Sequence, residues 1–260
     1  MLAAQRRDVL LHRLAGQGRI VAKDVAAELG VSEDSVRRDL RELAAEGLCQ
    51  RVYGGALPVA RAEADYAGRQ RVAPESKSAV AVRAARLIAP GMTAILDGGT
   101  TTLAVTQALP RDLRATIVTH SPTIAAALVE HPTVEVYLIG GRLFKHSAVV
   151  CGAAAAELAE GINADLFLLG VTGVHAEAGL TTGDPDEAAM KRALARRAAD
   201  TFVLASSEKI GAVSDFAVLP FDEVAGIVTD TDRDNATLRA LERLAVPLLI
   251  ADARDDGVDR

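Results

Sequence analysis

Aromatic residues are scarce in this chain of 260 residues, which has no Trp, three Tyr and five Phe. Proteins that bind single-stranded nucleic acid or RNA stack bases on aromatic side chains, so that class of function is poorly supported. The chain also lacks a run of about 18 apolar residues, the minimum for a membrane-spanning helix. Arg6, Arg7 and Asp8 stand where a secretory signal would have its apolar core. We therefore expect a soluble cytoplasmic protein.

The sequence offers little for metal or disulfide chemistry. Its two cysteines, Cys49 and Cys151, lie far apart and form no CxxC pair, which fits a reducing compartment. The five histidines, at positions 12, 120, 131, 146 and 175, show neither HxxxH nor HExxH spacing. We expect no metal and no cofactor.

The net charge of −6 is unevenly distributed along the chain. Residues 1–62 hold ten Lys and Arg against eight Asp and Glu, whereas the remainder holds 19 against 27. A basic patch can lie on one face of a nearly neutral domain, and its position decides whether phosphates are contacted. The acidic total is therefore compatible with DNA binding by the N-terminal part. Half the residues are hydrophobic, enough for a globular chain with a sizeable core.

Three short helical patterns follow one another in the first fifty residues. The first is centred on Leu10 and Leu14, and the second covers residues 22–29 and stops at Gly30, a C-terminal glycine cap. The third begins at Ser32, a good N-cap followed by two acidic residues in the first turn. The second and third patterns therefore predict two helices joined by a tight turn.

The third pattern places arginines on the side of the helix that faces away from the protein. Its apolar residues recur at i, i+4 and i+7 and form the inward stripe: Val36, Leu40 and Leu43. At about 100° per residue, Arg38 and Arg41 lie opposite this stripe, with Arg37 and Ser35 on its flanks. Insertion into a DNA major groove requires such a face, with donors for phosphates and guanine edges.

A β-hairpin follows the third helix. Residues 48–52 alternate like a strand and meet a Tyr-Gly-Gly turn at 53–55, which leaves Arg51 available for the DNA backbone. A small three-helix bundle with solvated arginines is the alternative. The order of helix, turn, capped helix and hairpin favours a winged helix-turn-helix over that bundle.

The stretch VSEDSVRRDLRELAAEGLCQRVYGGA, which ends at Ala56, closely resembles the signature of the DeoR family of bacterial repressors. Ser35 stands where Thr is common and keeps the hydroxyl. The resemblance implies that Ser35, Arg37 and Arg38 contact DNA, with Arg51 in the wing. Arg41 joins this set because of its place on the outward face.

The remainder of the chain has an α/β texture. Seven short apolar runs, TAILD, ATIVT, VEVYLIGG, DLFLLG, TFVLA, AGIVT and PLLIA, alternate with helical patterns near 101–109, 121–130, 186–199 and 233–244. This alternation predicts an α/β fold with a mostly parallel sheet behind the winged helix-turn-helix. The expected division is residues 1–57 for the DNA-binding domain, 58–74 for a linker, 75–252 for the larger domain and 253–260 for a tail.

Polar residues that could hold a ligand follow several of these strands. In parallel sheets ligands bind beyond the carboxyl ends of the strands. The TAILD strand runs into a glycine-threonine segment, where backbone amides and hydroxyls could hold an anion: Asp97, Gly98, Gly99, Thr100, Thr101 and Thr102. A plain strand-to-helix turn is the alternative. Gly141, the i, i+4 pair Glu187 and Lys191, and Lys209 are weaker candidates, because such residues are usually structural or solvated.

Further segments resemble successive blocks of the DeoR-family sensor domain, which is similar in fold to ribose-5-phosphate isomerase and binds phosphorylated sugars. They are LDGGTTT, VTHSP, LIGGR, ADLFLLGVTGV, GLTT followed by Glu187, SSEK and IVTD. The resemblance implies that the segment from Gly99 to Thr102 cradles the phosphate and that Lys209 neutralises it. Asp97, Glu187 and Lys191 would then face the sugar. The chain departs from the usual pattern at Ser206, commonly Asp, and at His120, commonly Asn.

These features predict a transcriptional regulator, most simply a repressor of a carbohydrate operon that a phosphorylated sugar releases from operator DNA. A homo-oligomer would place two winged domains on two half-sites. The alternative is a sugar-phosphate isomerase with an accessory DNA-binding module. In the resembling isomerase segment two acids stand three apart and a lysine follows; here Asp165 matches the first acid, Leu168 replaces the second and no lysine follows. We therefore expect no enzymatic activity.

Overall fold

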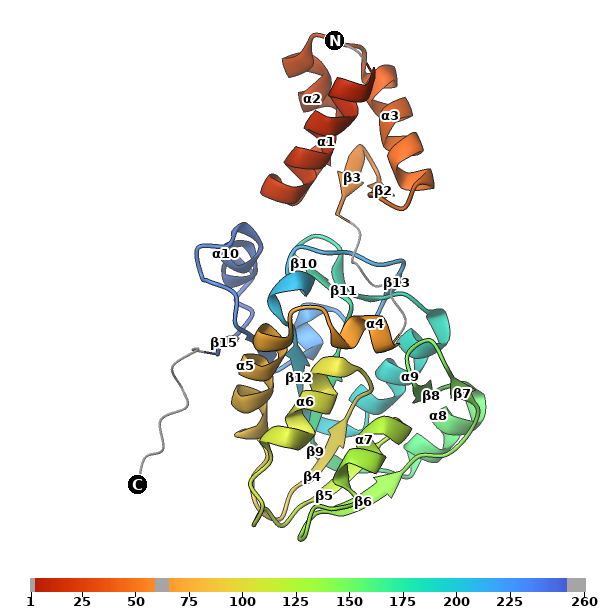
Figure 1. Ribbon diagram of the computed structural model, residues 1–260, viewed down its shortest axis with the longest axis vertical. Coiled ribbons are helices and arrows are strands. Elements are labelled where there is room, and N and C mark those ends of the chain that lie inside the picture. The colour runs from red at the N-terminus through yellow and green to blue at the C-terminus, as the bar shows by residue number, and fades with distance from the viewer. Residues whose placement is uncertain (1–2, 59–65, 252–260) are drawn as a thin grey trace.

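The computed structural model describes residues 3–58 and 66–251. The N-terminal part consists of α1 (Ala3–Gln17), β1 (Ile20–Val21), α2 (Ala22–Leu29), α3 (Glu33–Ala45), β2 (Gln50–Val52) and β3 (Gly55–Leu57). The three strands form one antiparallel sheet in the order β1-β3-β2. Figure 1 places this unit at one end of the molecule. The predicted winged helix-turn-helix is confirmed.

Local sequence signals explain the ends of these helices. Gly30 ends α2 in the left-handed conformation (φ 64°), which only glycine adopts at little cost. The Ser32 hydroxyl accepts a hydrogen bond from the Ser35 N–H at the start of α3. The buried residues of the three helices form a separate small core that includes Leu10, Val36 and Leu40. Strand β1 was not predicted, because two residues are too few to show alternation.

Two helices follow the DNA-binding unit before the large sheet begins. Helix α4 (Tyr66–Gln70) lies within the stretch expected to be linker, and α5 (Pro74–Ala85) follows it. Residues 59–65 of that stretch and the expected tail at 253–260 lie outside the described residues.

The large domain is built on a seven-stranded sheet in the order β15-β14-β12-β9-β4-β5-β6, and every pairing in it is parallel. Its strands are β4 (Thr93–Leu96), β5 (Thr116–Thr119), β6 (Glu135–Leu138), β9 (Ala164–Gly170), β12 (Ala198–Leu204), β14 (Gly226–Thr229) and β15 (Leu248–Ile250). Each of the seven predicted apolar runs contains or overlaps one of them, and β9 and β12 begin before the runs that predicted them. The predicted α/β class and parallel sheet are confirmed.

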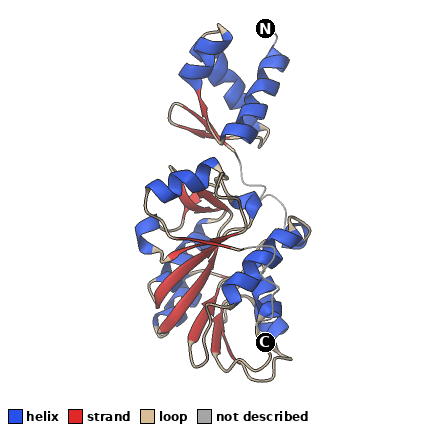
Figure 2. Cartoon of the chain, turned by 90° about the vertical axis from the view of Figure 1, so that its left-hand side faces the viewer, coloured by secondary structure: helices blue, strands red, loops and turns tan. Residues whose placement is uncertain are grey.

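Helices cover both faces of this sheet (Figure 2). Helices α5, α6 (Thr100–Ala108) and α7 (Pro122–Leu128) pack through one apolar cluster against one face. Helices α8 (Ala153–Glu160), α9 (Pro185–Ala195) and α10 (Ala236–Arg243) share the second cluster on the other face. The strand order reverses between β4 and β9, and such a switch point leaves a crevice at the carboxyl ends of the strands.

Short elements that were not predicted complete the domain. The hairpin of β7 (Leu143–Phe144) and β8 (Val149–Val150) and the antiparallel sheet of β10 (Gly173–His175), β11 (Gly179–Thr182) and β13 (Phe216–Ala217) form apart from the large sheet. Two 3-10 turns occur, η1 (Ser207–Lys209) and η2 (Phe221–Glu223). Helix α8 was not among the predicted helical patterns.

Candidate functional site

Helix α3 presents its arginines to solvent. Arg37, Arg38 and Arg41 are all exposed, as the helical spacing predicts. Arg37 donates to Glu33 one turn earlier at 2.6 Å. Such a surface pair stabilises a helix by only about 0.3 kcal/mol, so Arg37 can readily leave Glu33 to bind a phosphate. Ser35 is half-buried and shares a hydrogen bond with Ser32 at 2.9 Å. Arg51 is exposed on β2.

A buried ion pair fixes the orientation of α3. The Asp39 carboxylate is 2% exposed and accepts hydrogen bonds from both Nε and Nη2 of Arg6 on α1. Bidentate pairs of this kind specify geometry as well as adding energy. Because Asp39 follows Arg38 in the chain, the pair sets the direction in which the neighbouring arginines point. Sequence patterns could not predict this pair, since Arg6 and Asp39 are 33 positions apart in the chain.

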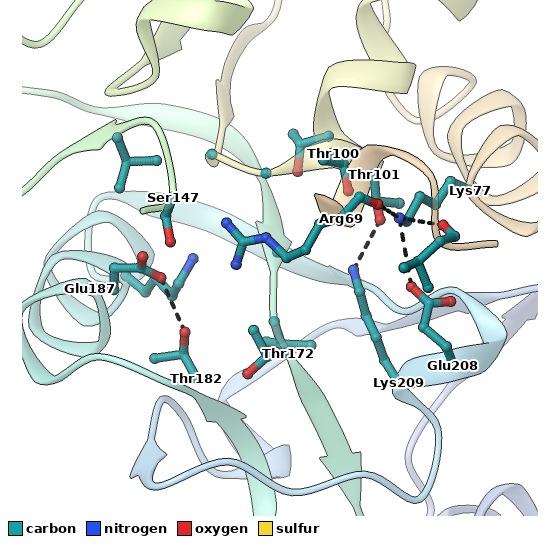
Figure 3. Close-up of a pocket in the computed structure, with 18 residues that line it drawn as sticks. Arg69, Lys77, Thr100, Thr101, Ser147, Thr172, Thr182, Glu187, Glu208 and Lys209 are labelled. Atoms are coloured by element: carbon teal, nitrogen blue, oxygen red, sulfur yellow. Dashed lines mark hydrogen bonds and ion pairs between the residues drawn. The ribbon is translucent and has the colours of Figure 1, made fainter. Parts of the chain in front are cut away.

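A pocket opens at the switch point of the sheet (Figure 3). Residues from the ends of β4 and β9, the start of α6, the β7–β8 hairpin, α9 and the η1 turn line it. Seven predicted effector residues are among the lining residues: Gly99, Thr100, Thr101, Thr102, Glu187, Lys191 and Lys209. Segments distant in the sequence therefore meet at one polar site, although contact of these residues with a ligand stays a prediction.

The glycine-threonine segment has the geometry of an anion site. Gly99 adopts φ 115° at the N-cap of α6, so the first amides of that helix remain available, and partial positive charge gathers at its N-terminus. A Cβ on Gly98 would lie 1.9 Å from Val149 Cγ1, so glycine is required for the β7–β8 hairpin to close on the segment. The buried hydroxyl of Thr102 has no hydrogen-bond partner in the protein. A bound anion would satisfy these donors together.

Four cationic side chains line the pocket against two carboxylates, Glu187 and Glu208. The cations are Arg69, Lys77, Lys191 and Lys209. Lys209 Nζ donates to the Thr101 hydroxyl at 2.9 Å (Figure 3). Burial lowers the pKa of Lys209 to about 8, and Glu208 opposes this shift while the neighbouring cations add to it. A site with this charge excess favours a dianion.

Arg69 and Lys77 are pocket residues that the sequence analysis missed. Lys77 is 5% exposed, and its ammonium donates to the backbone oxygens of Arg69 and Val72, both at 2.5 Å. Burial lowers the pKa of Lys77, and Glu208 counteracts that shift. Lys77 thus holds the end of α4 against α5, with the Arg69 side chain directed into the pocket (Figure 3). Residues 58–74 lack an apolar period, so the composition around Arg69 indicated only a linker.

Asp97 lies behind the pocket and does not line it. The side chain is fully buried, and its two oxygens accept four hydrogen bonds: from His120 Nε2 and Gly98 N, each at 2.8 Å, and from Lys191 Nζ at 2.6 Å and Gly170 N at 2.8 Å. Burial alone would raise the pKa of Asp97, but Lys191 and His120 outweigh it and lower the pKa to about 2. We revise its expected contact with the sugar to a positioning role, because no acceptor site faces the cavity.

Gly141 also departs from the expected role. It is exposed, it is not part of the pocket lining, and a Cβ there would lie 2.8 Å from Val150 Cγ1. Packing of β8 and the φ of 146° explain the glycine without a ligand.

The opposite end of the pocket offers acceptors. Glu187 is 6% exposed; one carboxylate oxygen accepts from the Thr182 hydroxyl at 3.2 Å, and the other is buried without a partner. The hydroxyls of Ser147 and Thr172 line the same cavity (Figure 3). An unpaired buried carboxylate oxygen costs free energy unless a ligand donates to it. Sugar hydroxyls have the required donors.

The residues that could have suggested isomerase chemistry are not placed for it. Asp165 lies at the amino end of β9, where it is exposed and accepts from Thr93 N at 2.8 Å. The pocket lies at the carboxyl end of the same strand, beside Gly170. Leu168 is completely buried in the core. The only acid of the isomerase pattern is therefore at the other end of the strand.

Two searches of the described residues gave no sites of other kinds. No group of three or more His, Cys, Asp or Glu side chains in residues 3–58 and 66–251 could hold a metal ion. Within the same ranges, no helix has the length and apolar character needed to cross a membrane.

Comparison with known families places both parts of the chain. Residues 6–61 match the DeoR-like helix-turn-helix domain, and residues 72–231 match the DeoR C terminal sensor domain. The chain is 33% identical to the HTH-type transcriptional regulator GlpR of Haloferax volcanii and 31% identical to the HTH-type transcriptional repressor GlcR of Bacillus subtilis, over the full length of all chains. It is 28% identical to the glycerol-3-phosphate regulon repressor of Escherichia coli, covering 81% of this chain and 84% of that one.

Solved structures that resemble the chain include ribose 5-phosphate isomerase A of Methanocaldococcus jannaschii. That match has a TM-score of 0.39 and 16% identity, and it covers 52% of this chain and 53% of the isomerase.

Proposed function

The chain belongs to the DeoR family of transcriptional regulators, and from this membership we propose that it represses a carbohydrate operon until a phosphorylated sugar or polyol binds its pocket. One observation carries the proposal: a helix with outward arginines and a cationic pocket with unsatisfied buried hydroxyl and carboxylate groups occur in one chain. The first suits operator DNA, and the second suits a phosphate attached to a polyol.

The polarity of the pocket orients the proposed ligand. The phosphate would lie against the start of α6, where Lys209, Lys77 and Arg69 supply positive charge. The hydroxyls would then point toward Glu187 and Thr182, whose acceptors complement O–H donors. The E. coli relative carries glycerol 3-phosphate in its name, and that compound has both a phosphate and hydroxyl groups.

Contacts between the two parts of the chain suggest how a ligand could alter DNA binding. Arg19 pairs with Glu177 in the turn between β10 and β11, and Gln50 of the wing donates to Asp215 at 3.0 Å. Asp215 follows Ser214, whose hydroxyl bonds that of Thr172 in the pocket wall at 2.7 Å. A ligand that moves this wall would shift the population of domain arrangements.

We also propose that the protein acts as a homo-oligomer. One α3 helix reads one half-site, so two copies are needed for an operator with two half-sites about one DNA turn apart. We further propose that the DNA-binding domain ends at residue 57, that residues 58–74 are a linker, and that the larger domain ends at residue 252 before a tail.

The direct test is a titration of DNA from the protein's own locus at fixed salt, followed by fluorescence anisotropy. We expect specific retention, and we expect glycerol 3-phosphate or a hexose phosphate to weaken it, with operator DNA weakening ligand binding by the same factor. Failure to retain any locus DNA at low salt would contradict the proposed repressor role. Ligand binding without a change in operator affinity would contradict the coupling alone.

Replacing Arg38 with alanine should weaken operator binding by about 1–3 kcal/mol if the guanidinium reads a base edge. The same loss is expected for Arg37→Ala, whereas a residue that contacts only phosphate would lower affinity for all sequences and reduce the salt dependence. Anisotropy with operator and scrambled duplexes separates these cases. Arg111→Ala, an exposed arginine of the large domain, is the matched control. Wild-type affinity and selectivity in both α3 variants would remove them from the interface.

Ligand affinity should fall as the pH rises from 7 to 9. The pKa of Lys209 is lowered to about 8, chiefly by burial, so the ammonium that attracts phosphate is largely lost over this interval. If only the protonated form binds, the dissociation constant rises up to about tenfold, because the phosphate itself stays a dianion. Calorimetry of wild type and Lys209→Arg tests this. The arginine variant stays charged, so its profile should be flat; an equally flat wild-type profile would show that Lys209 does not titrate at the site.

A further inference from the structure

Both ring nitrogens of His120 face hydrogen-bond acceptors. His120 lies just after β5 and is completely buried. Its Nδ1 is 2.6 Å from the carbonyl oxygen of Val150, and its Nε2 is 2.8 Å from Asp97 Oδ1. A neutral imidazole has one N–H and one lone pair, so it could donate to only one of these oxygens. The other contact would bring a lone pair against an oxygen in a fully buried place.

Neighbouring groups do not remove this conflict. The amide of Gly98 lies 3.3 Å from His120 Nε2, but the same N–H is closer to Asp97 Oδ1, at 2.8 Å. Asp97 Oδ2 cannot carry the proton without facing a donor, because Lys191 Nζ and the Gly170 amide already donate to it at 2.6 and 2.8 Å. Only an imidazolium, with a proton on each nitrogen, satisfies both oxygens.

Two other histidines show the opposite pattern by the same reasoning. Nδ1 of His131 accepts from the amide of Val134 at 3.3 Å, and Nε2 faces the carbonyl oxygen of Pro110 at 3.1 Å. Nδ1 of His175 accepts from the amides of Glu177 and Ala178 at 3.2 and 3.3 Å. Each of these rings therefore has one nitrogen that accepts a hydrogen bond from a backbone amide.

We propose that His120 is a positioning residue held as an imidazolium, which fastens the β7–β8 hairpin over the pocket and adds positive charge beneath the anion cradle. The Val150 amide donates to the His120 backbone oxygen at 2.8 Å, so ring and backbone together bind β8 to the end of β5. The hairpin in turn brings Ser147 and Val149 to the cavity.

The charges around the ring support this role. Asp97 of the β4 end faces His120 directly and also binds Lys191 of α9, while β8 offers only a carbonyl. With His120 protonated, this buried group of three carries one net positive charge, and Glu187 of α9 lies in the pocket wall. A neutral residue at 120 would leave Asp97 and Lys191 neutral overall, so the attraction for a phosphate dianion would fall. This consequence rests on the proposed phosphate ligand, whereas the protonation state does not.

Nitrogen NMR of the imidazole rings tests the protonation state in the full chain without ligand. At pH 7.5 the two ring nitrogens of His120 should both show the protonated pattern, identified by their loss in His120→Asn. His131 and His175, whose Nδ1 atoms accept from backbone amides, should each show a single tautomer. A single-tautomer pattern for His120 would overturn the proposal.

Calorimetry with glycerol 3-phosphate and with inorganic phosphate tests the effect on binding. His120→Asn should weaken both by about tenfold or more at pH 7, the fold-change of one charge-assisted interaction, and His120→Gln should do the same. His131→Asn, which removes a histidine remote from the pocket lining, should leave affinity within about twofold of wild type. Unchanged affinity in folded His120 variants contradicts the proposal. If wild type binds neither probe, the proposed ligand class fails, and the NMR result still decides the state of His120.

Discussion

Replacing Asp97 with asparagine should lower the free energy of unfolding of the large domain by about 3–5 kcal/mol, because it breaks a buried ion pair from one side. Asp97 accepts four hydrogen bonds, one of them from the ammonium of Lys191. The amide nitrogen of asparagine would face a donor whichever way the side chain turns. For a domain of this size the loss corresponds to a fall in Tm on the order of 10 °C, measurable by calorimetry.

An exposed carboxylate provides the control for this effect. Asp200→Asn on β12 should change stability by less than about 0.5 kcal/mol. The free energy of unfolding measured below pH 4 adds a second readout, because the folded pKa of Asp97 is lowered to about 2 from 3.8. A carboxylate with a lowered pKa stabilises the fold above its unfolded pKa, so wild type should lose this contribution as the pH falls from 4 through 2. Asp97→Asn should lack that loss. A variant as stable as wild type would show that Lys191 and His120 do not depend on this carboxylate.

Sequence periodicity was sufficient to predict the large sheet, since its central strands such as β4, β9 and β14 are largely buried, whereas the edge strand β6 is mostly exposed. Runs such as TAILD and DLFLLG are continuously apolar for this reason, and all seven became parallel strands. The short β7–β8 and β10–β11 hairpins could not be predicted in this way. Strands of two to four residues show too little alternation, and their stability comes from contacts such as Val149 on Gly98 that depend on the finished fold.

The candidate site was predictable where its signal was local. The glycine-threonine segment combines strand end, glycine and helix start within six residues, and the resemblance to a known family added Glu187, Lys191 and Lys209. The role of Asp97 depends on partners 23, 73 and 94 positions away, so its sequence context suggested a ligand contact instead. Lys77 gave no signal because its hydrogen-bond acceptors are backbone oxygens, which any sequence supplies.

Lys209→Met should weaken binding of a phosphorylated ligand by about 10- to 150-fold, equivalent to about 1.5–3 kcal/mol for a charge-assisted hydrogen bond. Release from operator DNA should be lost over the ligand range that releases wild type, while operator affinity without ligand stays normal. The reason is that Lys209 lines the pocket of the large domain and donates to Thr101 there, whereas α3 belongs to the N-terminal unit. Lys209→Ala should have the same effect. Anisotropy with and without glycerol 3-phosphate measures both quantities, and Lys145→Met, an exposed lysine, serves as the control.

The same substitution should leave the protein as stable as wild type or more so, which separates a ligand-binding lysine from a structural one. Burial lowers the pKa of Lys209 to about 8, so at pH 7 the fold holds a charge that its surroundings disfavour. The stability of wild type should therefore rise between pH 8 and pH 10.5, as the folded protein releases this proton before the unfolded chain does. Methionine carries no charge, so the variant does not bear the free-energy cost of burying an ammonium group at neutral pH. Its Tm should therefore equal that of wild type or be higher, by about 2–4 °C for each kcal/mol of stability gained. Functional sites typically retain such unfavourable charges at the expense of stability, so a lysine that holds an anion should not be needed for the fold. A destabilised variant with normal ligand release would instead mean that Lys209 supports the η1 turn and does not hold an anion.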